Sequence, residues 1–209
     1  MKVLIIGATG GTGRAVVSAA KAAGHEVTAL VRSAEKAVDL PIDHLLEGSV
    51  LDPAALARAM QGIEAVISVL GTKLSPIREV RLLSQATELM VQQMQQAGVR
   101  RFICVTGMGA GDSRGHGGAL FDGLLLPLLL CKIYQDKNRQ EAVIKSSDLD
   151  WTIVRPSVLS DRPGRQSYRA LTDLSAFHGG SIARADVAHF LVQQLSSDDW
   201  LRKTPLISD

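Results

Sequence analysis

The first thirteen residues hold an apolar run, a glycine-rich turn and the start of an alanine-rich segment. Residues 3–6 are apolar, glycines follow at Gly7, Gly10 and Gly13, and alanines dominate residues 14–23. A strand, a tight turn and a helix in this order bind the pyrophosphate of a dinucleotide. The glycines permit the turn, a close approach of backbone to phosphate, and close packing of helix on sheet; the unpaired N–H groups at the helix start face the phosphates. The sequence therefore predicts a dinucleotide-binding turn in preference to a purely structural one.

The end of the second apolar run, residues 26–31, bears on the choice of cofactor. NAD-binding chains carry an Asp or Glu there for the ribose 2′-hydroxyl. This chain has Arg32, with Ser33 beside it and Lys36 one turn further on. A guanidinium and a lysine suit a 2′-phosphate through charge-assisted hydrogen bonds, so NADP(H) is predicted in preference to NAD(H). The alternative is that Arg32 and Lys36 are ordinary solvated charges, since Glu35 could pair with them locally.

The length and the charge of the chain restrict its class. With 209 residues it is long enough for one α/β domain and too short for two, so we predict a single nucleotide-binding domain over residues 1–209. The formal net charge is +2 and the basic residues are scattered, which argues against binding to nucleic acid or to an anionic membrane. Cys104 and Cys131 lie in apolar stretches, and neither they nor the histidines have metal-ligand spacing, so no metal site is predicted.

The start of the chain and its most apolar segment bear on location. The N-terminal apolar run is short and ends in the glycine turn, unlike a secretory signal, so a cytoplasmic location is expected. Residues 124–130 are strongly apolar but are interrupted by Pro127, and they fall far short of the roughly 20 residues that span a bilayer. They are expected to form a core wall, a substrate pocket or a dimer contact, in a monomer or a homodimer.

Apolar runs alternate with helix-like segments along the chain. This alternation predicts a Rossmann-type α/β fold, with a doubly wound parallel sheet covered on both faces. Asp52 before Pro53 is typical of a helix start, and Ala97 before Gly98 of a helix end. The predicted strands are residues 3–6, 26–31, 44–47, 65–70, 101–106 and 151–154; the predicted helices are 11–23, 53–61, 76–97, a stretch between 118 and 147, and 183–195.

Five stretches carry a resemblance to a known family. They are Gly-Ala-Thr-Gly-Gly-Thr-Gly at 7–13, Ala-Leu-Val-Arg-Ser at 29–33, Val-Ile-Ser-Val-Leu-Gly-Thr at 66–72, Trp-Thr-Ile-Val-Arg-Pro at 151–156 and Ile-Ala-Arg-Ala-Asp-Val-Ala at 182–188. With them the chain resembles, over essentially its whole length, the atypical short-chain dehydrogenase/reductases, a group that includes biliverdin reductase B (flavin reductase) and NmrA-like proteins. The motifs specify fold and cofactor class strongly and substrate weakly.

The resemblance implies a set of cofactor-binding residues, each directly after a predicted strand, where open α/β sheets bind ligands. Arg32 is implied for the 2′-phosphate, and Thr106 is implied to lie beside the nicotinamide. The others form four groups: Gly7, Thr9, Gly10, Gly11 and Thr12 at the pyrophosphate; Val50, Leu51 and Asp52 at the adenine; Leu70, Gly71 and Thr72 along the ribose and nicotinamide; and Arg155, Pro156 and Ser157, also beside the nicotinamide.

The resemblance also implies catalytic residues. In the wider superfamily a Ser or Thr acts with a Tyr-x-x-x-Lys to protonate a carbonyl oxygen as hydride arrives. Thr106 fills the first role, and Tyr134 with Lys137 matches the pair with one residue fewer between them. Both spacings keep the side chains on one helical face. Alternatively, Tyr134 packs in the core, and Lys137 pairs with Glu141 on the helix surface. His116, in a glycine-rich stretch, is either a proton donor or a solvent-exposed loop residue.

Three functions are compatible with these features. The first is an NADPH-dependent oxidoreductase that transfers hydride to an apolar, planar small-molecule acceptor such as a flavin, a quinone or a bilin. A substrate loop and helix insert at about 107–135 would cover the acceptor. The second is a non-catalytic NADP(H)-sensing protein of the NmrA-like kind, with residues 124–130 as a partner surface. The third and weakest is a nucleotide-sugar epimerase or dehydratase, because only about 53 residues follow Pro156.

Overall fold

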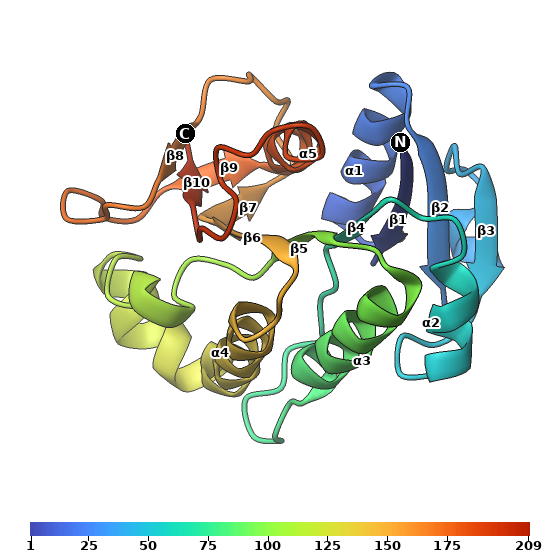
Figure 1. Ribbon diagram of the computed structural model, residues 1–209. Coiled ribbons are helices and arrows are strands. Elements are labelled where there is room, and N and C mark those ends of the chain that lie inside the picture. The colour runs from blue at the N-terminus through green and yellow to red at the C-terminus, as the bar shows by residue number, and fades with distance from the viewer.

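The computed structural model describes all of residues 1–209 as one α/β domain around an eight-stranded sheet (Figure 1). Its strands are β1 (Lys2–Ile6), β2 (Glu26–Val31), β3 (His44–Glu47), β4 (Ala65–Ser68), β5 (Arg101–Val105), β6 (Asp150–Pro156), β8 (Arg169–Leu171) and β10 (Leu206–Ser208). The strand order is β3-β2-β1-β4-β5-β6-β10-β8, and all neighbours are parallel except β10 and β8. The six predicted strands are the first six of this sheet, in the Rossmann order.

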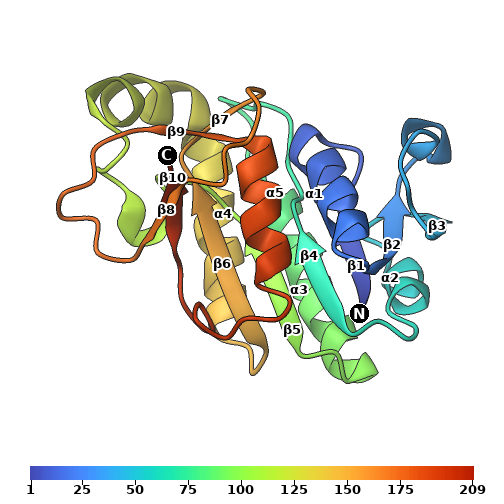
Figure 2. The same ribbon diagram turned by 90° about the horizontal axis from the view of Figure 1, so that it is seen from above.

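Helices cover both faces of the sheet, which confirms the predicted doubly wound arrangement. One face carries α1 (Gly11–Ala22) and α5 (Arg184–Gln193), which lie side by side (Figure 2). The other carries α2 (Pro53–Ala59), α3 (Leu82–Ala97) and α4 (Cys131–Lys145). Each face has its own apolar core, with Val16, Val17 and Leu191 in the first and Leu56, Met90 and Ile144 in the second.

Two predicted helix signals act as expected. The Asp52 carboxylate accepts a hydrogen bond from the Ala54 N–H at 2.9 Å, with Pro53 at the first helical position of α2. Gly98 ends α3 in the left-handed conformation, at φ 71°. The predicted start of that helix at residue 76 is wrong: α3 begins at Leu82, where the buried Asp136 carboxylate of α4 accepts the Leu83 N–H at 2.8 Å. No local signal reveals a cap from another helix.

The C-terminal third departs most from the sequence-based expectation. Besides β8 and β10 it contains β7 (Val158–Ser160) and β9 (Ser181–Ala183), which form a separate two-stranded parallel sheet. Each of these four strands has only three residues, too few to show a periodicity.

The segment expected to be helical between 118 and 147 consists of two parts. A π-helix, η3 (Phe121–Leu130), precedes α4 and contains Pro127, which cannot donate to an α-helical ladder. Two short 3₁₀ turns, η1 (Ala34–Ala37) and η2 (Gly111–Ser113), lie in loops. No helix is both long and apolar enough to span a bilayer.

Candidate cofactor and acceptor site

The glycine turn lies between β1 and α1, at the edge of the sheet where the parallel strands end (the carboxyl edge). Gly7 has φ +87°, and a Cβ on it would lie 2.8 Å from the Val69 carbonyl oxygen. A Cβ on Gly13 would overlap the Gly7 carbonyl oxygen. The Gly10 N–H donates to the Gly7 carbonyl at 3.0 Å, which closes the turn. Gly7 and Gly13 are therefore required by the backbone, as the sequence predicts.

The outer side of this turn fits the phosphates of a dinucleotide. Gly10 is exposed and begins α1 without a side-chain cap, and the first turn of α1 holds no acidic residue. The positive end of the helix and its unpaired N–H groups are thus available to an anion. Thr9 and Thr12 are partly buried beside the glycines. The turn is a cradle that larger side chains would fill, and its donors match a pyrophosphate.

Arg32, Ser33 and Lys36 lie in the loop that follows β2 at the same edge. The Arg32 and Lys36 side chains are exposed and form no ion pair, so Glu35 does not neutralise them. Arg14, in the first turn of α1, joins this group: its guanidinium donates to the Lys36 carbonyl and the Asp39 carboxylate, each at 2.7 Å. The sequence analysis did not single out Arg14, although it directly follows the glycine motif.

The residues implied for the adenine and the ribose follow β3 and β4 at the carboxyl edge. Val50 is buried, Leu51 is exposed, and the Asp52 carboxylate is engaged as the cap of α2. Leu70 is partly buried against the apolar cores, Thr72 is partly buried, and nothing lies within 4 Å of where a Cβ on Gly71 would be. The fold therefore brings both groups to the edge that holds the glycine turn.

A pocket of about 210 Å³ lies at the ends of β5 and β6, under η3 and α4; we call it the acceptor pocket. It gathers the three predicted catalytic residues with Pro156 and Ser157 from the end of β6. Most of its other walls are apolar. The lining residues are Val105, Thr106, Gly107, Met108, Phe121, Tyr134, Lys137, Pro156, Ser157, Val158 and Leu159.

The polar side chains of this pocket are engaged with fixed partners. The Thr106 hydroxyl donates to the Glu141 carboxylate at 2.9 Å, and the Tyr134 hydroxyl donates to the Met108 carbonyl at 2.7 Å. The Lys137 ammonium donates to the Thr106 carbonyl and lies 4.8 Å from the centre of the Tyr134 ring. The alternative in which Lys137 pairs with Glu141 on the helix surface is wrong, because Glu141 is buried and binds Thr106 and Arg155.

Burial shifts the pKa values of two of these groups in opposite directions. It lowers the pKa of Lys137 to about 8, although the nearby negative charge of Glu141 acts to raise that pKa. It raises the pKa of Tyr134 to about 12, with a further contribution from Asp122. Near neutral pH the lysine is therefore a cation whose pKa lies close to the pH, whereas the tyrosine keeps its proton.

Arg155 is the largest fully buried side chain, and its guanidinium binds two carboxylates. It donates to Glu141 at 2.9 Å through Nε and at 2.6 Å through Nη2, and to Asp112 in the loop after β5 through Nη1. Burial alone would raise the pKa of Glu141, but bonding to Arg155 holds it below its usual value. Arg155 therefore does not line the acceptor pocket, whereas its neighbours Pro156 and Ser157 do; its own charge is paired with Glu141 and Asp112.

His116 does not line the acceptor pocket. Its Nδ1 lies 3.2 Å from the Phe177 carbonyl oxygen, and its ring stacks against His178 at 6.5 Å between centres. The Gly179 N–H also donates to the His116 carbonyl at 2.7 Å. His116 therefore holds two loops together, and the structure gives it no place as a proton donor to this pocket.

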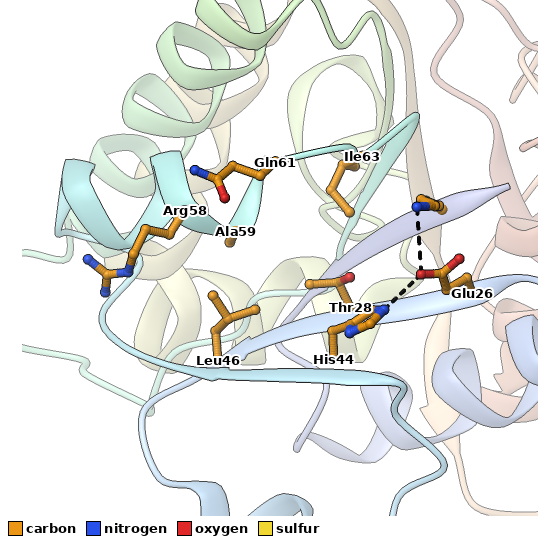
Figure 3. A pocket seen from close by; sticks show the side chains of 9 residues that line it. Glu26, Thr28, His44, Leu46, Arg58, Ala59, Gln61 and Ile63 are labelled. Atoms are coloured by element: carbon orange, nitrogen blue, oxygen red, sulfur yellow. Dashed lines mark hydrogen bonds and ion pairs between the residues drawn. The ribbon is translucent and has the colours of Figure 1, made fainter.

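A second recess, of about 200 Å³, lies at the opposite edge of the sheet, among the starts of β1, β2 and β3 and the end of α2 (Figure 3). Its acidic group is already paired: Glu26 lies 2.7 Å from His44 and 3.9 Å from Lys2. Arg58 lies at the far end of the recess from this cluster (Figure 3). The recess is remote from the glycine turn and contributes nothing to the cofactor site.

The fold and the glycine turn together define a Rossmann-type nucleotide-binding protein. The chain belongs to the NAD(P)H-binding family, whose model matches residues 7–198. It is 31% identical to the uncharacterized sugar epimerase YhfK of Bacillus subtilis, over 93% of this chain and 88% of YhfK. It is 27% identical to the photosystem II assembly factor Ycf39 of Synechocystis over 98% of this chain, and it spans 61% of the length of that relative.

Solved structures with the same fold include reductases. An anaerobilin reductase of Escherichia coli, ChuY, aligns with a TM-score of 0.83 at 22% identity, over 100% of this chain and 97% of ChuY. A short-chain dehydrogenase/reductase of Veillonella parvula in complex with NADP aligns with a TM-score of 0.81 at 17% identity, over 100% and 94%. The chain thus shares its fold with these reductases, and its membership in the NAD(P)H-binding family rests on the family model.

Proposed function

We propose that the protein is an NADPH-dependent reductase of an apolar, planar acceptor such as a flavin, a quinone or a bilin. The observation that carries this proposal is the acceptor pocket, in which apolar walls surround one titratable cation at the end of β5, on the edge that holds the glycine turn. Apolar walls exclude water and favour a flat, largely hydrophobic ligand. When bound, the nicotinamide cofactor supplies the hydride.

The count of available protons favours Lys137 as the proton donor. Thr106 and Tyr134 each have one hydroxyl proton, and each gives it to an internal acceptor. An ammonium has three protons, and Lys137 commits only one of them, to the Thr106 carbonyl. A pKa of about 8 suits proton donation near neutral pH. The Thr106 carbonyl then keeps the Lys137 ammonium in place, and the Thr106 hydroxyl oxygen can accept a hydrogen bond from a ligand.

The preference for NADPH over NADH is supported by the loop after β2. Arg32 and Lys36 are exposed cations without ion-pair partners, and the residue directly after β2 is Arg32 instead of an Asp or Glu that would bind a ribose 2′-hydroxyl. The 2′-phosphate would meet a guanidinium, an ammonium and the Ser33 hydroxyl. The remaining cofactor residues are proposed in the roles that the family resemblance implies.

The name of the relative YhfK favours a second candidate, a sugar epimerase. An epimerase of this kind binds a polar, hydroxylated substrate, whereas the acceptor pocket offers Ser157 and Lys137 among mainly apolar side chains. A nucleotide sugar bound with an affinity comparable to that of NADPH would favour this candidate.

The test is oxidation of NADPH by the purified protein, followed by the loss of nicotinamide absorbance, with FMN, a benzoquinone, a naphthoquinone and biliverdin as acceptors. We expect turnover on at least one acceptor, and faster turnover with NADPH than with NADH. The substitution Lys137→Met should lower this turnover. Lys132→Met, on the same helix but outside the pocket, is its matched control. Tight NADPH binding without turnover on any acceptor would contradict the proposal and favour a cofactor sensor.

A further inference from the structure

Gly11 is the one glycine of the turn that the backbone geometry of the turn does not require. Gly7 and Gly13 are needed by the backbone, and Gly10 begins the helix. A Cβ on Gly11 would instead meet a side chain from the other end of the chain: it would lie 3.0 Å from Nε and 3.2 Å from Cδ of Arg184. The absence of a side chain at Gly11 therefore makes room for Arg184.

Arg184 is held in this place by two features of the fold. It is the first residue of α5, which lies beside α1, so the two helices begin close together at the carboxyl edge (Figure 2). Its Nη1 donates to the Asp161 carboxylate, just after β7, at 2.6 Å. Nε and Nη2 have no acceptor within the protein, and the side chain is 28% exposed.

We propose that Arg184 binds the pyrophosphate of NAD(P)H, opposite the N–H groups at the start of α1. The pyrophosphate is an anion that the helix end compensates only in part, with roughly half a unit charge. A guanidinium with two uncommitted donor groups beside Gly11 supplies the missing charge and directional hydrogen bonds. Asp161 fixes the orientation of Arg184 through the third group.

Measurements of cofactor affinity can distinguish this role of Arg184 from the role proposed for Arg32. A contact with the pyrophosphate acts on NADPH and NADH alike, because both contain that group. A contact with the 2′-phosphate acts on NADPH alone. The probe 2′-AMP carries the 2′-phosphate without the pyrophosphate, so its affinity should depend on Arg32 and not on Arg184.

The experiment compares Arg184→Gln with wild type by calorimetric titration of NADPH and NADH, and by competition with 2′-AMP. We expect the Kd of both dinucleotides to rise by the same factor, about tenfold or more, since a hydrogen bond between charged groups is lost. The affinity for 2′-AMP should not change. Arg165→Gln is the matched control, because Arg165 is an exposed arginine whose side chain makes no hydrogen bond in the structure.

A second substitution tests the contact with Gly11 directly. Gly11→Ala should displace the flexible Arg184 side chain by a few tenths of an ångström and weaken both dinucleotides by about threefold. In the Arg184→Gln background the same change should have no further effect. Unfolding without cofactor should be unaltered by Arg184→Gln, since its pairing with the largely exposed Asp161 is worth little.

Three results would overturn the proposal: an unchanged Kd for NADPH in Arg184→Gln, a loss confined to NADPH, or additive effects of Gly11→Ala and Arg184→Gln. None of these measurements depends on turnover. A failure here is therefore separate from a failure of the proposed reductase activity.

Discussion

The glycine turn and the acceptor pocket share the carboxyl edge of one sheet, but they are made of different parts. The turn consists of backbone from seven consecutive residues, 7–13, and its geometry follows from where side chains are absent. The pocket is lined by residues of β5, β6, β7, η3, α4 and the loop after β5, and its polar side chains Thr106, Tyr134 and Lys137 are bonded to partners distant in sequence. The first region is a local property of the chain, and the second is a property of the assembled fold.

This difference implies that substitutions in the two regions should fail in different ways. At Gly7 or Gly13 of the turn, one added methyl group should weaken cofactor binding strongly, because the atoms that it meets are backbone and cannot move aside. In the pocket, removal of one functional group should leave cofactor binding intact, and the effect on turnover should depend on which group is removed. The four substitutions below test this contrast in decreasing order of expected effect.

Lys137→Met should lower kcat by about 10²- to 10⁴-fold, the usual contribution of a general acid. In wild type, kcat should also fall as the pH rises through about 8, because the Lys137 ammonium loses its proton. In Lys137→Met, kcat should not fall as the pH rises through about 8. Steady-state kinetics against pH measure both effects, with Lys132→Met as the control. A variant that keeps the wild-type pH profile would show that another group supplies the proton.

Gly13→Ala should weaken NADPH binding by about 100-fold. The new Cβ would overlap the Gly7 carbonyl oxygen and lie 2.8 Å from the Ala8 backbone, so the turn has to open. Gly123→Ala is the control, since nothing lies within 4 Å of a Cβ at that position. Equal Kd values for the two variants in a fluorescence titration would mean that the turn is not the cofactor site.

Arg32→Asp should raise the Kd of NADPH by about 10- to 150-fold, corresponding to about 1.5–3 kcal/mol for a hydrogen bond to a charged group. NADH lacks the 2′-phosphate, so its Kd should change little. Arg58→Asp, at the opposite edge of the sheet, controls for the change in net charge. A parallel loss for both cofactors would remove Arg32 from the 2′-phosphate site.

Tyr134→Phe should have the smallest effect, with kcat within about threefold of wild type. Its hydroxyl donates to the Met108 carbonyl, so its loss should instead lower the free energy of unfolding by about 0.5–1.5 kcal/mol. Chemical denaturation and steady-state kinetics on the same protein separate the two outcomes. A 100-fold fall in kcat would make Tyr134 the proton donor in place of Lys137.

The contrast between the regions also explains what the sequence could and could not predict. The strands β1 to β6, the glycine turn and the caps at Asp52 and Gly98 depend on neighbours in sequence, and the structure has them where they were predicted. The start of α3 could not be predicted, because its cap, Asp136, lies on α4. The same limit applies to the Glu141–Arg155 pair and to Arg184 beside Gly11, whose partners are far apart in the chain.

The two carboxylates bound to Arg155 differ sharply in exposure, and the two ion pairs therefore differ in what they cost to break. Glu141 is 3% exposed, whereas Asp112, in the loop after β5, is 76% exposed. Breaking the Arg155–Asp112 ion pair therefore costs little, because water can solvate the exposed carboxylate. Breaking the Arg155–Glu141 pair would leave an unpaired charge in the core. The hydrogen bond that orients Thr106 therefore comes from the carboxylate whose ion pair with Arg155 costs more to break.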